Sequence, residues 1–187
     1  MKEFPFCVEV CLGFHCSGAG EYSWGEGTLK LEDAQVDQLV SLIRESGGVT
    51  DIEELGLEEK YPDIYKALEE AYSDAAGSAT ARHWLIAGFE GGYFDEPEGL
   101  MEKLEEDGLF KYEPEEGEDE EDLEDAKDEA YCEWKDEYID SLSEDELYAF
   151  LLKYYSHVWD DCDDMEPGEY EVEIPDGIIE LASGKGD

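Results

Sequence analysis

Basic residues are scarce in this chain: 12 Lys and Arg stand against 55 Asp and Glu among 187 residues, so the formal net charge at pH 7 is −43. A surface this anionic repels phosphates and acidic lipid head groups, which argues against direct nucleic-acid binding and against docking on an acidic membrane. Apolar residues still make up 41 % and aromatic residues 12 %. That share is sufficient for a buried core, so the acidity does not indicate disorder.

The chain also lacks long apolar runs. None approaches the roughly 18 residues that a membrane-spanning helix needs. The first residues, Met-Lys-Glu-Phe-Pro-Phe, do not have the layout of a signal peptide. Five cysteines at irregular spacing make a poor disulfide framework and favour reduced thiols. We therefore expect a cytoplasmic protein with no membrane partner.

Recognisable catalytic motifs are missing as well. The sequence contains no GxxxxGK[ST] loop, no GxGxxG between a strand and a helix, no GxSxG elbow and no HExxH pair. A catalytic pair of carboxylates cannot be singled out among 55 acids. These observations favour a non-enzymatic protein without a cofactor, and an enzyme or metal-binding protein whose site is not visible in the sequence is an alternative.

Strands are predicted at both ends of the chain. Residues 4–16 alternate between apolar and polar side chains, which is typical of a half-buried strand, and residues 21–31 form the returning strand of a hairpin after a turn at 17–20. Gly25 and Gly27 in the second strand suggest a bulge. Near the C-terminus, residues 169–174 alternate again, and a turn at 175–177 leads to a predicted strand at 178–182.

The middle of the chain has helical periodicity. We expect an interruption at Gly77-Ser78 and capping boxes at Thr50 to Glu53 and at Ser143 to Glu146. The predicted helices are 33–46, a short one ending near Gly56, one beginning at Pro62, 79–88, one that Asp95 caps and Gly108 ends, 119–140, and one containing Leu147 to Val158.

This order of elements predicts the fold class. It is α+β, with an antiparallel sheet from N-terminal and C-terminal hairpins packed against a mostly helical middle region. We expect a single domain over residues 1–187. The acidic segment 113–118 is the place where two subdomains could separate.

Candidate metal ligands lie near the N-terminus. Cys7, Glu9, Cys11 and His15 share one face of the predicted strand, and Cys16 follows. Residues four apart on a straight strand are about 13 Å apart, which is too far for Cys7 and Cys11 to bind one zinc ion. We interpret them as small, half-buried side chains under a helix.

Three other polar groups do not predict a site. The acidic run from Asp160 to Glu166 lacks the glycine and the spacing of an EF-hand. His157 precedes Asp160 and Cys162, but a position near a helix C-terminus explains it. His83 is interpreted as structural because no acid–base partner is near it in the sequence.

The negative charge is concentrated. Residues 113–146 hold 19 acids and 2 lysines, for a net charge of −17, whereas residues 1–50 have a net charge of −5. In the predicted helix 119–140, apolar residues form one stripe and acids occupy the other faces. The net charge of this helix per unit length is about half that of duplex DNA. The partner-binding candidates are Asp122, Glu124, Asp125, Asp128, Asp136 and Asp140.

In charge and size the chain is similar to the DNA-mimic inhibitors that phages and mobile elements encode against restriction and other defence systems. No motif carries this similarity, and no residue takes a role from it. It implies a basic, nucleic-acid-binding protein as the partner. The alternatives are an interaction or scaffold protein whose acidic face is only solvating, and a halophilic protein, although halophilic adaptation would acidify residues 1–50 as well.

The concentration of like charges predicts a salt dependence. Screening acts over about 10 Å at 0.1 M salt and weakens the repulsion within residues 113–146. The melting temperature should therefore rise with NaCl between low and physiological ionic strength, as measured by circular dichroism. A flat or falling curve would show that these charges are paired or too far apart to matter.

Overall fold

The computed structural model describes residues 1–14, 20–114, 120–158 and 166–184. The chain forms two compact units. Unit 1 combines residues 1–83 with residues 161–187, and unit 2 consists of residues 84–160. The division falls inside a long helix and after residue 160, not at the acidic segment 113–118. That the chain is one domain stays a prediction.

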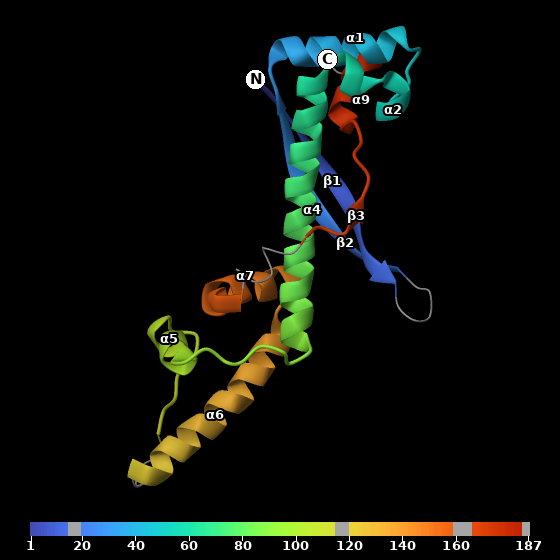
Figure 1. Ribbon diagram of the computed structural model, residues 1–187. Coiled ribbons are helices and arrows are strands. Elements are labelled where there is room, and N and C mark those ends of the chain that lie inside the picture. The colour runs from blue at the N-terminus through green and yellow to red at the C-terminus, as the bar shows by residue number, and fades with distance from the viewer. Residues whose placement is uncertain (15–19, 115–119, 159–165, 185–187) are drawn as a thin grey trace. The chain divides into compact units, whose positions relative to one another are not determined.

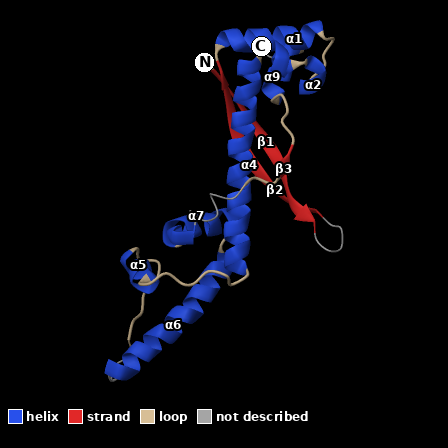
Figure 2. Ribbon diagram, in the orientation of Figure 1, coloured by secondary structure: helices blue, strands red, loops and turns tan. Residues whose placement is uncertain are grey.

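Unit 1 is built on a three-stranded antiparallel sheet in the order β2-β1-β3. Strands β1 (Lys2–Phe14) and β2 (Gly20–Leu31) form the predicted hairpin, and β3 (Glu169–Tyr170) pairs with β1 on the other side. Figure 2 shows the strands in red. The alternation in β1 has its expected effect, because one face is buried and the other is exposed. The buried residues are Phe4, Phe6, Val8 and Val10.

The bulge lies in β1 and not in β2, where it was predicted. The register of β1 against β2 shifts between Cys11 and Gly13. The glycines of β2 instead permit close packing. A Cβ on Gly25 would lie 2.4 Å from the Ala75 carbonyl oxygen, and a Cβ on Gly27 would lie 2.3 Å from the Phe6 ring. Gly25 is therefore the point at which helix backbone meets strand backbone.

Helix α4 (Pro62–Glu90) is continuous over 29 residues, so the predicted break at Gly77-Ser78 is wrong. A glycine in a helix interior costs about 1 kcal/mol relative to alanine, which tertiary packing can outweigh. Here Ala75, Ala76 and Ala79 are buried in the core with the sheet. The Thr80 hydroxyl also donates a hydrogen bond to the Ala76 carbonyl at 2.8 Å.

Helices α1 (Asp33–Glu45) and α9 (Asp176–Ala182) lie together at one end of the sheet (Figure 1). Helix α1 (Asp33–Glu45) agrees with the prediction. Helix α2 (Ile52–Leu55) begins one residue later than predicted, because Asp51 and not Thr50 is the N-cap. Helix α3 (Leu57–Lys60) follows the left-handed Gly56.

The predicted strand 178–182 is wrong, because these residues belong to helix α9 (Asp176–Ala182). The C-terminal segment therefore contributes one strand to the sheet, and the α+β class with an antiparallel sheet is confirmed. Ile178 is completely buried against the core. The Arg44 guanidinium donates hydrogen bonds to the Leu181 and Ala182 carbonyls at 2.7 and 2.9 Å, which satisfies the end of the helix.

The described helices of unit 2 include the end of α4 and helices α5, α6 and α7. Helix α5 (Leu100–Glu106) begins after Gly99, later than the predicted cap at Asp95. Helix α6 (Glu120–Ser141) agrees with the predicted helix 119–140. Helix α7 (Glu144–Tyr154) begins with the predicted capping box of Ser143 and Glu146.

Two glycines of unit 1 give a matched test of this packing. Gly25→Ala should destabilise the protein by about 1–3 kcal/mol, because the new methyl group overlaps the Ala75 carbonyl. Gly77→Ala should stabilise it by about 0.5–1 kcal/mol, because a Cβ there meets nothing within 4 Å. Urea unfolding measures both free energies. Equal effects of the two substitutions would refute the close approach at Gly25.

Candidate anionic interface

The inward face of α6 is aromatic. Tyr131 is buried, and its ring lies 5.5 Å from that of Phe110; the Trp134 and Tyr138 rings stack at 4.9 Å. Tyr138 in turn meets Phe150 of α7. These contacts use the stripe that the sequence predicted, and they fix which side of α6 faces the rest of unit 2.

Both lysines of α6 lie beside this stripe and are paired. Lys127 contacts the Glu105 carboxylate at 2.8 Å, and Lys135 pairs with Glu96. The Tyr131 hydroxyl also donates a hydrogen bond to Glu96, at 3.0 Å. Burial and this hydrogen bond raise the pKa of Tyr131, so the phenol is neutral at physiological pH. The positive charge of α6 is thus neutralised within unit 2.

A third ion pair joins α7 to the end of α5. Asp107 accepts a hydrogen bond from the Tyr154 hydroxyl at 2.6 Å and contacts the Lys153 ammonium at 2.9 Å. These two donors lower the pKa of Asp107. Three of the five lysines in unit 2 are therefore paired with carboxylates.

The remaining surface of α6 carries only acids among its charged side chains from residue 123 onward. At about 100° per residue, these acids spread over an arc of roughly 220°. Lys135 lies at one edge of this arc, and the aromatic residues and Lys127 lie in the remainder. All eight are exposed. They are Glu124, Asp125, Asp128, Glu129, Glu133, Asp136, Glu137 and Asp140.

The structure thus places five of the six predicted residues on this acidic face. Asp122 lies in the first turn of α6, where the backbone alone is described. The prediction did not include Glu129, Glu133 and Glu137, which are equally exposed. The sequence was sufficient to identify these three residues, because a helical wheel aligned on the predicted apolar stripe places all of them on the outward side of the helix.

The spacing of the carboxylates is close to that of phosphates along one DNA strand. From Glu124 to Asp140 the helix rises about 24 Å, at about 1.5 Å per residue. Eight carboxylates over that length give about one per 3 Å, compared with one phosphate per 3.4 Å of a single strand and per 1.7 Å of a duplex. One face of one helix therefore approaches the charge density of one strand.

The other polar candidates do not form a centre. Among the described residues no group of three His, Cys, Asp or Glu side chains could hold a metal ion. Cys7 is exposed and Cys11 half-buried on the uncovered face of β1, so the expectation that they lie under a helix is wrong. His15, Cys16 and residues 160–165 lie outside the described residues. His83 does have an acidic partner, since its Nε2 lies 2.9 Å from a Glu21 carboxylate oxygen.

Comparison of the chain with models of protein families, with curated proteins and with solved structures finds no match in any of the three. In the described part of the chain, no helix combines the length and the apolar character needed to cross a bilayer.

The inward lysines give a stability prediction. Lys135→Gln should lower the free energy of unfolding by about 0.5–1 kcal/mol, because it leaves the half-exposed Glu96 carboxylate without its cation. The exposed Lys111 of the same unit provides the control, and Lys111→Gln should have a smaller effect. Urea unfolding at low salt measures both. An equal loss in the two variants would mean that the Lys135 pair is not stabilising.

Proposed function

We propose that this chain is a non-enzymatic binding protein that presents the acidic face of α6 to a basic, nucleic-acid-binding protein, in the manner of a DNA mimic. The observation that carries the proposal is the segregation of charge on α6. Its two lysines are paired with glutamates of unit 2, while eight carboxylates face solvent.

The physical reason for this arrangement favours a partner. A helix whose acidity only solvates the surface has no need to remove lysines from its outer face, because mixed charges on a helix stabilise it through pairs at i and i+4. Instead, like charges lie next to one another, for example Asp136 and Asp140, which repel each other. A partner with clustered Lys and Arg would relieve that repulsion on binding.

The alternative is an interaction or scaffold protein in which α6 is a solvated face and the binding surface lies elsewhere. The two functions differ in what competes for the partner. A DNA mimic and duplex DNA occupy the same basic surface, so duplex DNA should displace the chain. The affinity should also fall linearly with salt on logarithmic axes.

The test is a fourfold charge removal on α6. Asp122, Glu124, Asp125 and Asp128 become Asn or Gln together, and DNA-binding proteins recovered from the native host are identified on the parent chain and on the variant. The variant should lose the partner that duplex DNA displaces from the parent, and any residual binding should depend less on salt. Each single substitution should change binding little, because exposed charges contribute small increments.

A variant with the same loss of charge in unit 1 is the matched control. Glu53, Glu54, Glu58 and Glu59 are exposed on α2 and α3, and their joint change to Gln should leave the partner bound. If the α6 variant retains its partner as well as the parent does, the acidic face is only solvating. If one single substitution abolishes binding, the site is a specific pocket and mimicry is wrong.

A further inference from the structure

Strand β1 has an edge that its neighbours leave open. On one side β1 pairs with β2 along its length, but on the other side β3 pairs with Val10 and Cys11 alone. No further strand pairing is present on that side within the described residues. The edge from residue 2 to residue 9 therefore presents backbone N–H and C=O groups without a ladder partner, which is the usual template for an added strand.

The chain after β3 follows this edge without closing it. It is held at one end by Gly168, where a Cβ would lie 2.4 Å from the Cys11 carbonyl oxygen, and whose N–H donates to the Thr80 hydroxyl at 3.2 Å. At the other end Gly177 lies against the Phe4 ring, where a Cβ would be 3.2 Å away. Between β3 and Gly177 the segment runs beside β1 without ladder pairing.

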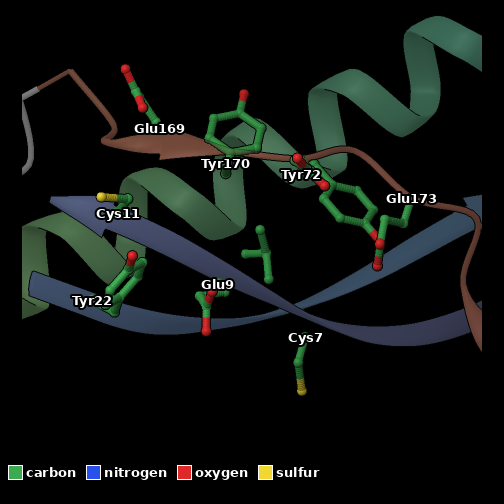
Figure 3. A pocket seen from close by; sticks show the side chains of 10 residues that line it. Cys7, Glu9, Cys11, Tyr22, Tyr72, Glu169, Tyr170 and Glu173 are labelled. Atoms are coloured by element: carbon green, nitrogen blue, oxygen red, sulfur yellow. The ribbon is translucent and has the colours of Figure 1, made fainter. Parts of the chain in front are cut away.

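A hollow of about 490 Å³ opens beside β1 along this part of the segment. Figure 3 shows β1 on one side, residues 169–173 on the other and α4 with Tyr72 behind them. Its volume lies in the range of ligand pockets. Burial and the Glu173 carboxylate raise the pKa of Tyr72 to about 12, so this phenol is neutral. Cys7, which is exposed, is also one of the residues that line the hollow.

The charge of this hollow has one sign. Four of the ten residues that line it are glutamates, and none is basic. Glu9 comes from β1, and Glu169, Glu171 and Glu173 come from the other wall. All four are exposed, and no ion pair joins them to another described residue. A cationic ligand would therefore meet carboxylates on both sides.

The spacing of the wall glutamates matches an extended chain. Residues 169–174 alternate between exposed and covered side chains, and Glu169, Glu171 and Glu173 are the exposed ones. At about 3.3 Å per residue they are about 6.6 Å apart. An extended peptide with Lys or Arg at every second position places its cations at the same interval.

We propose that this hollow binds an extended basic segment of a partner protein, with Lys or Arg at alternate positions, along the open edge of β1. The edge of β1 hydrogen-bonds to the peptide backbone, as in strand addition, and the glutamates of both walls pair with the cationic side chains. The site lies wholly in unit 1 and does not rest on the function proposed for α6.

Thiol protection tests the proposal directly. The probe is a peptide of about twelve residues that alternates lysine and threonine, and the readout is the alkylation rate of each cysteine, followed by mass spectrometry of the digested full chain. Saturating peptide should slow alkylation of Cys7 about tenfold, because bound peptide blocks access to it. Cys132, exposed on α6, is the internal reference and should react at an unchanged rate.

Variants and matched probes complete the design. The triple variant Glu169→Gln, Glu171→Gln, Glu173→Gln should weaken peptide binding about tenfold in fluorescence anisotropy, since three charge contacts are lost. The variant Glu124→Gln, Asp125→Asn, Asp128→Asn removes the same charge from α6 and should bind as the parent does. A peptide with the same composition but with its lysines contiguous should bind more weakly.

Each contrary outcome overturns the proposal in a different way. Protection of Cys132 but not of Cys7 would place the peptide on α6. Equal binding of the contiguous peptide, or equal protection of Cys7 by spermine, would mean that the hollow binds any polycation and does not select an extended peptide with alternating lysines. None of these outcomes bears on whether the α6 variant loses a DNA-binding partner, so the two proposals fail separately.

Discussion

Like-charge repulsion is the constraint under which this chain folds. A net charge of −43 on 187 residues opposes every compact state, because folding brings carboxylates closer together. The apolar contacts of each unit must outweigh this term. Unit 1 does so with a sheet face and the small residues of α4, and unit 2 does so with a cluster of aromatic rings.

The same constraint explains how the few cations are used. Lys127, Lys135 and Lys153 each contact a carboxylate beside the aromatic cluster, and Arg44 closes the end of α9. Lys127 and Lys135 are half-buried, and each offsets a carboxylate that would otherwise be partly desolvated without a partner. Lysines paired in this way do not neutralise the acids on the outward face of α6, so that face remains strongly negative.

Local patterns in the sequence were sufficient to predict the elements whose buried and exposed faces follow from their own periodicity. The alternation of β1 and the stripe of α6 are of this kind, and so is the capping box at Ser143. The failures depended on contacts with distant residues. Gly77 gave no break because the alanines around it pack on the sheet, and residues 178–182 became a helix that Arg44 completes.

The candidate sites show the same division. The acidic face of α6 could be predicted, because an amphipathic pattern states which residues face outward. The hollow beside β1 could not, since it forms only where the chain returns after more than 150 residues and stays anchored at Gly168 and Gly177. Neither anchor has a local signal that distinguishes it from a turn glycine.

The position of the C-terminal segment in unit 1 also governs the order in which the two units can fold. Unit 1 is discontinuous, with unit 2 inserted between its two parts. Unit 2 is one continuous stretch of 77 residues, so its internal contacts can form while the ribosome is still adding the C-terminal part. The pairing of Val10 with Tyr170 closes a loop of 160 residues and must wait for the last strand. Until then the hairpin of β1 and β2 has an edge without a strand partner along its whole length, and such an edge is a template for pairing with other chains.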